Sequence, residues 1–259
     1  MTSDRRPSKW LLRRPKDDSP VRVFCFPYAG VGASMYAKWP RTIGPAEVCL
    51  VQLPGRENRL REPHFGTYEE LTEGLLEGLE PHLDRPFAFF GHCSGALPAF
   101  AAAAELARRG QRVPDRLFLS SQVAPHEGPY GRLLDLGRDE LADELVALTR
   151  AMGGEPHPDL IDLGVGILAA DIEANRRYRL DAPLRLPTTL TTIGWREDTV
   201  IPAAKTAGWR EYAPDGDTRE VLLDGGHYAF LDAPEALVAE LAADLAALAP
   251  SKKTEADRT

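Results

Sequence analysis

Cysteine is scarce in this sequence, and its placement follows no disulfide or metal-site pattern. The 259 residues include three cysteines, Cys25, Cys49 and Cys93, which are odd in number and far apart. Disulfide-stapled domains and zinc sites need cysteines in even numbers or in closely spaced pairs. The sequence therefore predicts neither a disulfide framework nor a metal centre, and at least one cysteine should be a free thiol.

Long apolar runs and an excess of positive charge are also missing. No stretch approaches the roughly 20 unbroken apolar residues that span a bilayer, and the segment before Val21 holds no apolar run of signal-peptide length. Lys and Arg number 31 against 39 Asp and Glu, a formal net charge of -8, which disfavours a surface built to bind phosphate backbones. We therefore expect a cytoplasmic, monomeric protein with no membrane or nucleic-acid partner.

What the sequence does contain is an alternation of short apolar runs and helical patterns. Six runs typical of buried parallel strands begin at Val21, Glu47, Phe87, Arg116, Thr188 and Arg219. Helical periodicity occupies residues 67–79, 96–109 and 233–248. This alternation predicts an α/β fold with a mostly parallel central sheet flanked by helices.

One interval interrupts the alternation. From about Gly131 to Leu186 there is no convincing strand, but helical patterns cover 139–152 and about 158–178. A helical insertion between strands suits a lid over an active site. An apolar face in its second helix allows two interpretations, the lining of a pocket or plain core packing: Leu160, Leu163, Ile167 and Ile172.

The two ends of the chain differ in composition from the part between them. Residues 1–19 and 250–259 are polar and rich in charge, so we expect two flexible segments. Between them we expect a single domain over residues 20–249, with the lid at about 131–186. Three apolar residues are candidates for fastening the first segment to the domain: Trp10, Leu11 and Leu12.

The strongest chemical motif is Gly-His-Cys-Ser-Gly, from Gly91 to Gly95, between a predicted strand and an alanine-rich helix. It matches the strand–turn–helix setting of the Gly-x-Ser-x-Gly nucleophile elbow, with Cys93 in place of serine. A glycine two residues to either side lets neighbouring backbone pass close to such a turn. Ser94 lacks that framing, so we predict Cys93 as the nucleophile and the backbone N–H of Ser94 as an oxyanion donor. The alternative is a small buried thiol at Cys93.

A nucleophile at this position needs a base and an acid, which follow it along the chain in the order acid, histidine. His227 follows the last predicted strand and is the candidate base. Asp198 follows the preceding strand and is the candidate acid, with Glu197 as the alternative. His92 is interpreted as a packing residue. An imidazole and a helix N-terminus both favour a thiolate at Cys93.

The glycine-rich loop after the first predicted strand, residues 26–34, is the expected source of a second oxyanion donor. Its glycines allow a turn that aims backbone N–H groups into a cleft, and Tyr28 is the candidate, with the neighbouring Ala29 left open. No P-loop lysine and no Gly-x-Gly-x-x-Gly fingerprint is present, so the sequence predicts no cofactor.

Six motifs in this order give the chain a family resemblance. They are Phe26–Gly30, Leu53–Glu57 with Arg59, Gly91–Ala96, Ala170–Ala174 with Tyr178, Gly194–Val200 and Gly226–Tyr228. Over about residues 10–248 the sequence resembles the type II thioesterases of polyketide and nonribosomal peptide assembly lines. The resemblance implies an α/β-hydrolase fold with a helical lid, and hydrolysis of acyl groups from the phosphopantetheine arm of acyl or peptidyl carrier proteins.

The chain departs from that family at Cys93, because the family elbow normally reads Gly-His-Ser-x-Gly-Ala. A cysteine acyl-enzyme is itself a thioester, so transfer to a second thiol costs little. A cysteine-dependent acyltransferase between carrier proteins is therefore the alternative function, and a non-catalytic carrier-binding relative is a third. An engineered replacement of serine is a further interpretation. Three arginines beside the lid are candidates for carrier docking: Arg176, Arg177 and Arg179.

Overall fold

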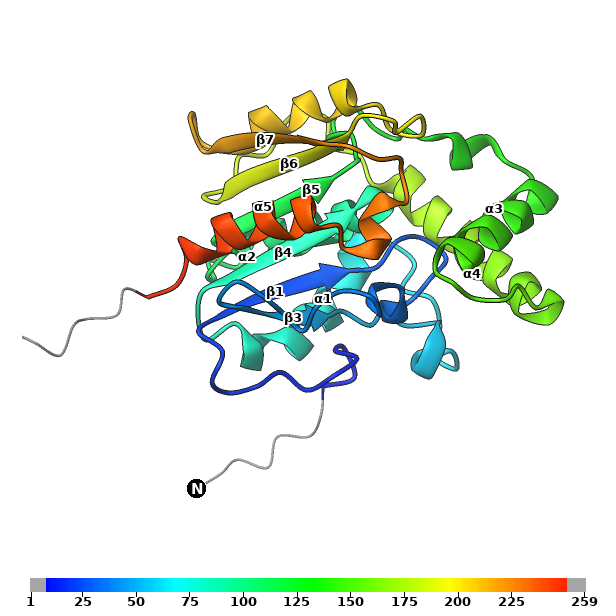
Figure 1. Ribbon diagram of the computed structural model, residues 1–259, viewed down its shortest axis with the longest axis horizontal. Coiled ribbons are helices and arrows are strands. Elements are labelled where there is room, and N and C mark those ends of the chain that lie inside the picture. Colours follow the sequence, from blue (N-terminus) through cyan, green and yellow to red (C-terminus); the bar gives the residue numbers. More distant parts are fainter. Residues whose placement is uncertain (1–7, 251–259) are drawn as a thin grey trace, which may run out of the picture.

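A seven-stranded sheet forms the centre of the structure, a computed structural model that describes residues 8–250 (Figure 1). Residues 1–7 and 251–259, which belong to the two segments predicted to be flexible, lie outside the described residues. The strand order is β2-β3-β1-β4-β5-β6-β7. Six strands are parallel and correspond to the six predicted runs: β1 (Val21–Phe26), β3 (Ala46–Leu50), β4 (Phe87–His92), β5 (Arg116–Ser120), β6 (Thr189–Trp195) and β7 (Thr218–Leu223).

The edge strand β2 (Thr42–Ile43) is antiparallel to β3 and was not predicted. Two residues are too few to produce an alternating pattern, so a sequence carries almost no signal for such a strand.

Helices cover both faces of the sheet. Helices α1 (Tyr68–Leu79) and α2 (Ala96–Arg108) pack on one face, over side chains such as Phe24 and Phe89. Helix α5 (Glu235–Ala246) packs on the other face, over side chains such as Val23. Alternate residues of the central strands β1, β4 and β5 thus enter two separate hydrophobic cores. The predicted α/β architecture with a mostly parallel sheet is confirmed.

The insertion between β5 and β6 is helical, as predicted. It contains α3 (Arg138–Ala151) and α4 (Pro158–Arg177), which pack against each other beyond the carboxyl ends of the strands (Figure 1). Loops that leave those strand ends are where α/β proteins place their functional groups. The insertion therefore lies next to the site that the motifs predict.

The predicted apolar face of α4 is wrong for two of its four residues. Leu160 and Leu163 are 66% and 45% exposed, whereas Ile172 is buried. The stripe that packs on the domain is instead Val165, Leu168 and Ile172, spaced by three and four residues as a helix requires. The first turns of α4 project beyond the sheet and its covering helices (Figure 1), so Leu160 and Leu163 are not packed in a hydrophobic core.

The N-terminal segment is packed against the domain from Ser8 onward. Trp10 and Leu11 are buried, and Leu11 forms an isolated bridge with Val51. The Trp10 ring lies so close to Gly78 of α1 that any side chain there would collide with it. Within residues 8–250, no helix combines the length and the apolar character needed to cross a membrane.

Two leucines of α4, the buried Leu168 and the exposed Leu160 near the start of the helix, give a direct test of this packing. We expect Leu168→Ala to lower the free energy of unfolding by about 2–5 kcal/mol, because it removes a buried side chain. Leu160→Ala in the same helix should change it by less than about 0.5 kcal/mol, because that side chain is exposed. Denaturant unfolding of both variants measures the difference, and equal losses would contradict the assigned face.

Candidate active site

The turn between β4 and α2 holds Cys93 in a strained conformation. Cys93 has a φ of 50°, in the left-handed region that non-glycine residues rarely adopt. A side chain at Gly91 would collide with the backbone of Gly95, and one at Gly95 would lie 2.7 Å from the carbonyl oxygen of Pro27. The two glycines therefore allow β4, α2 and the loop after β1 to meet around Cys93, which is the geometry of a nucleophile elbow.

Asp198 and His227 are joined by a buried hydrogen bond. His227, in the loop after β7, has its Nδ1 2.9 Å from Oδ2 of Asp198, in the loop after β6, and the two side chains are 4% and 0% exposed. Glu197, the alternative acid, instead accepts the backbone N–H of Gly225 and is exposed. The structure thus places Asp198, and not Glu197, beside the imidazole.

Three further hydrogen bonds hold the Asp198 carboxylate. Its Oδ1 accepts the backbone N–H groups of Val200 and Ile201, both at 2.9 Å, and its Oδ2 accepts the hydroxyl of Ser121 at 2.8 Å. Sequence reasoning missed Ser121, which follows β5 and has a φ of 45°. The residue is next to Asp198 only because β5 and β6 are neighbours in the sheet, and no local motif marks it.

The charges around His227 favour its protonated form. Burial lowers the pKa of His227, but the negative charge of the Cys93 thiolate and the hydrogen bond to Asp198 raise it, to about 9 overall. Burial likewise raises the pKa of Asp198, yet its bond to His227 and the charge of that imidazole hold it below the ordinary value. The surroundings of His227 therefore favour an imidazolium beside the Asp198 carboxylate.

The contact between Cys93 and His227 is not yet a regular hydrogen bond. The thiol interacts with the imidazole, but the buried Nε2 has no hydrogen-bond partner of regular geometry within residues 8–250. Catalytic hydrogen bonds are often long or misaligned before substrate binds and tighten afterwards. The arrangement is compatible with proton transfer between these two residues.

His92 packs beside the triad, as its position predicts. Its ring stacks on Phe230 at a centroid distance of 3.8 Å, and its Nδ1 lies 2.8 Å from the hydroxyl oxygen of Ser120. Burial lowers the pKa of His92 well below the ordinary value, so the ring is neutral at pH 7. A neutral ring 4.8 Å from His227 adds no charge that would oppose the imidazolium.

Both candidate donors in the loop after β1 already have acceptors in this structure. The backbone N–H of Tyr28 donates to Sδ of Met35 at 3.0 Å, and that of Ala29 donates to the hydroxyl oxygen of Ser94 at 2.8 Å. A thioether is the weaker acceptor of the two. The Tyr28 N–H is therefore the easier one to redirect toward an oxyanion.

The side chain of Tyr28 is also part of the site, which the sequence did not indicate. The phenol interacts with Cys93 and Tyr228, and its ring centroid lies 5.8 Å from that of His227. Burial and the neighbouring Cys93 charge raise the pKa of Tyr28 well above its ordinary value. The hydroxyl therefore stays protonated and can donate a hydrogen bond beside the nucleophile.

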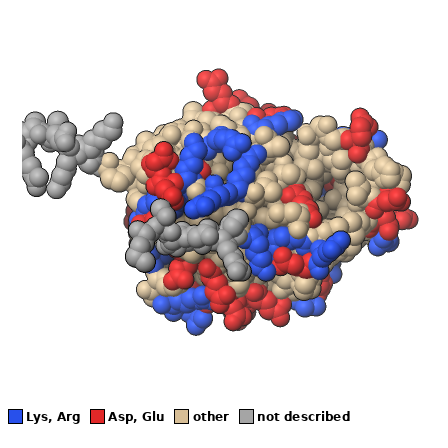
Figure 2. Space-filling view, turned by 90° about the horizontal axis from the view of Figure 1, so that it is seen from below, with Lys and Arg blue, Asp and Glu red and all other residues tan. Residues whose placement is uncertain are grey.

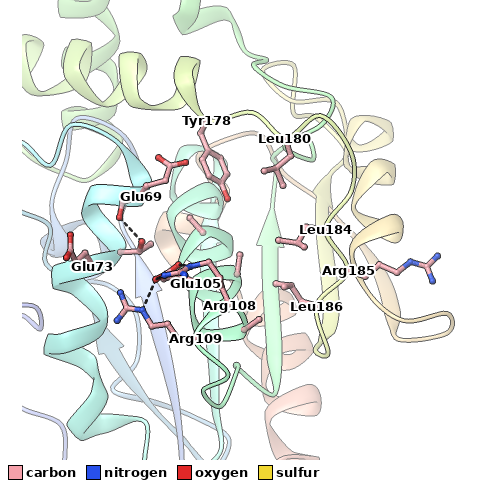
Figure 3. A pocket seen from close by; sticks show the side chains of 14 residues that line it. Glu69, Glu73, Glu105, Arg108, Arg109, Tyr178, Leu180, Leu184, Arg185 and Leu186 are labelled. Carbon is pink, nitrogen blue, oxygen red and sulfur yellow. Dashed lines mark hydrogen bonds and ion pairs between the residues drawn. The ribbon is translucent and has the colours of Figure 1, made fainter.

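Two cavities lie near the loop after β1 and the helices that follow it. A pocket of only about 10 Å³ adjoins Ser94, Tyr28 and Tyr68. A groove of about 920 Å³ lies farther out, between α1, α2 and residues 178–186 (Figure 3). Tyr178 lines that groove and contacts Tyr68 with ring centroids 5.2 Å apart, so this tyrosine pair stands between the two spaces. No group of three His, Cys, Asp or Glu side chains within residues 8–250 could hold a metal ion.

Comparison with known proteins gives one family and several relatives. The thioesterase domain family matches residues 21–245. The chain is 33% identical over 245 residues to linear gramicidin dehydrogenase LgrE of Brevibacillus parabrevis, covering 90% of this chain and 91% of that protein. It is 30% identical over 223 residues to gramicidin S biosynthesis protein GrsT of Aneurinibacillus migulanus, covering 82% and 84%.

Among solved structures, the RedJ thioesterase from the prodiginine biosynthetic pathway of Streptomyces coelicolor is similar to this chain. The two share 34% sequence identity with a TM-score of 0.74, over 88% of this chain and 91% of RedJ.

The charges in the site predict a pH dependence. Because the folded pKa of His227 is raised from 6.5 to about 9, the imidazolium stabilises the folded state fully below about pH 6.5, and this contribution is lost as the pH rises through about 9. Cys93→Ala removes the thiolate charge and should lower the pKa of His227. Titration of the imidazole by NMR, with the exposed His157 as an internal reference, measures the shift. An unchanged His227 titration in the variant would contradict the assigned thiolate–imidazolium interaction.

Proposed function

Because this chain belongs to the thioesterase family of α/β-hydrolases, we propose that it hydrolyses acyl thioesters carried on the phosphopantetheine arms of carrier proteins in polyketide or nonribosomal peptide biosynthesis. The observation that carries the proposal is Cys93 in a strained elbow beside the buried His227–Asp198 hydrogen bond. The names of GrsT and RedJ, which refer to gramicidin S and prodiginine biosynthesis, support the pathway class. LgrE is named a dehydrogenase, but this chain lacks the Gly-x-Gly-x-x-Gly dinucleotide fingerprint.

In the first half-reaction the Cys93 thiolate attacks the thioester carbonyl carbon. The carbonyl oxygen becomes an oxyanion, which the backbone N–H of Ser94 and an N–H of the loop after β1 stabilise. Collapse of this intermediate breaks the bond to the pantetheine sulfur, and His227 gives that sulfur its proton. The products are a free carrier thiol and an acyl group on Cys93.

In the second half-reaction the now neutral His227 removes a proton from water. The resulting hydroxide attacks the acyl carbon, the bond to the Cys93 sulfur breaks, and the carboxylic acid leaves. The thiolate–imidazolium pair is thereby restored. Asp198 holds the imidazole in the required tautomer throughout and does not itself take up the proton.

Acyl transfer between carrier proteins is the second candidate function, and the cysteine at position 93 favours it. The acyl-enzyme on Cys93 is a thioester, nearly equal in energy to the substrate, so a second carrier thiol can accept the acyl group at little cost. A docked carrier delivers its thiol at high effective concentration, whereas water must enter a covered site.

Carrier proteins are usually acidic, and this chain is also negative overall. Carrier docking would therefore require a local group of basic side chains. Arg176, Arg177 and Arg179 are exposed at the end of α4 and just after it, and the first two share Glu173 as an ion-pair partner. Figure 2 shows that Lys and Arg side chains gather in clusters on one face, with Asp and Glu side chains between them. The net charge is therefore unevenly spread, and local positive surface is available to a negatively charged partner.

The covalent step is tested by mass spectrometry of the intact chain after exposure to an acyl thioester. We expect an acyl adduct that maps to Cys93, and loss of at least about 10³-fold in turnover in Cys93→Ala, because the nucleophile is gone. Ser94→Ala is the matched control and should keep the adduct. An adduct on Ser94, or undiminished turnover in Cys93→Ala, would refute the assignment of Cys93. Absence of both adduct and turnover in the unaltered chain would favour a carrier-binding relative without catalysis.

The choice between hydrolysis and transfer is tested with Cys93→Ser. The oxygen ester formed by the serine variant is a poorer acyl donor to a thiol, so we expect a higher ratio of free acid to transferred product. The measurement follows a labelled acyl group from one carrier protein, with and without a second free carrier. If both forms of the enzyme give only free acid, in equal proportion, the transferase candidate fails and Cys93 serves a hydrolytic thioesterase.

A further inference from the structure

A buried ionic cluster ties the helical insertion to the body of the domain. Asp171, in the middle of α4, receives two hydrogen bonds from the guanidinium of Arg56, at 2.7 and 2.8 Å. The two side chains are 5% and 2% exposed. Asp171 and Arg56 are 115 positions apart in the chain, so this contact fixes a point of the insertion against the loop that follows β3.

The same carboxylate holds two more groups. Its Oδ2 accepts the backbone N–H of Gly30 at 2.7 Å, and its Oδ1 lies 2.7 Å from Nε2 of His64. Nδ1 of His64 accepts the N–H of Gly66, so a neutral ring with its proton on Nε2 donates to Asp171. Arg56 also donates to the carbonyl oxygen of Val31 at 3.2 Å. The cluster thus binds the loop after β1 at two neighbouring backbone groups, the N–H of Gly30 and the carbonyl oxygen of Val31.

Gly30 is where the insertion rests on the loop. It has a φ of 76°, and a side chain there would lie 3.0 Å from Cβ of Leu168 in α4 and 3.2 Å from Leu145 in α3. The two residues before it, Tyr28 and Ala29, carry the candidate oxyanion N–H groups. A shift of Gly30 therefore moves those donors.

Stability alone does not account for an ionic group at this place. The cost of removing two charges from water commonly cancels their attraction, so an apolar pair of similar volume is often as stable. Burial raises the pKa of Asp171, but the charge of Arg56 and the hydrogen bonds hold it at about 2, so the carboxylate is charged at neutral pH. What an apolar pair could not supply is an acceptor directed at the Gly30 N–H.

We propose that Asp171 is a positioning residue that orients the oxyanion loop through its hydrogen bond to the Gly30 N–H. The inference rests on the proposed function, since it concerns the oxyanion formed when Cys93 attacks a thioester. It assigns α4 a role in the reaction itself: the donors of the loop are correctly aimed only while this helix is seated on Gly30.

The test compares two double variants of the full chain that differ in one acceptor. Arg56→Met/Asp171→Asn and Arg56→Met/Asp171→Leu both remove the buried charges, and Asn and Leu are similar in shape. Only Asn keeps an oxygen for the Gly30 N–H. The control is Asp162→Asn, which is in α4 like Asp171 and removes an exposed ion pair to Arg138 of α3. The rate of Cys93 acylation by a small acyl thioester is measured at saturation, together with the half-saturating concentration.

We expect the Leu double variant to acylate about 10²-fold more slowly than the Asn double variant, because a small displacement of the donors costs that much. Half-saturating concentrations should agree within about threefold. Alkylation of Cys93 by iodoacetamide, which needs the thiolate but no oxyanion donor, should differ by less than about twofold. The Asn double variant and Asp162→Asn should stay within about fivefold of the parent chain.

Equal acylation rates in the two double variants would overturn the proposal and leave Asp171 as an anchor of the insertion only. A parallel loss of alkylation would overturn it as well, because the nucleophile itself would then be disturbed. Should the Leu variant not fold, Arg56→Met/Asp171→Ala makes the same comparison. Absence of acylation in the unaltered chain is a different result, since it refutes the proposed function together with this inference.

Discussion

The close approach of three backbone segments around Cys93 is the constraint on which the rest of the site depends. Gly91 and Gly95 bring the end of β4 and the start of α2 against the loop after β1, with no room for another atom. The order of the strands in the sheet then determines where the other residues of the site lie. Strands β5, β6 and β7 follow β4 in sequence across the sheet, so the loops carrying Ser121, Asp198 and His227 leave at the same edge.

Much of this arrangement could be predicted because its signals are local. The six parallel strands are compact apolar runs, and the helices of the insertion show their own periodicity. The elbow combines a cysteine, two glycines and a strand–helix junction within a few residues, and the order of acid and histidine follows from the class of fold. The sequence therefore indicated Cys93, Asp198 and His227, and the structure brings these three side chains together.

The features that could not be predicted depend on contacts between distant segments. Ser121 meets Asp198 because two strands are neighbours, and Asp171 meets Arg56 across 115 positions. The buried side of α4 depends on where the domain ends beneath it, so Leu160 and Leu163 look equivalent to Ile172 in sequence but not in space. For Tyr28, the sequence suggested the backbone N–H, whereas the structure also places the phenol against the nucleophile.

The buried, ionised Asp198 has a consequence for the end of the catalytic cycle. Hydrolysis in the proposed reaction forms a carboxylic acid, and loss of its proton gives a second carboxylate one imidazole away from the Asp198 carboxylate. Two like charges in a region that excludes water repel each other far more strongly than they would in bulk solvent. In the proposed reaction the site therefore binds the ionised product less well than the neutral acyl group, and we expect weak product inhibition by that acid.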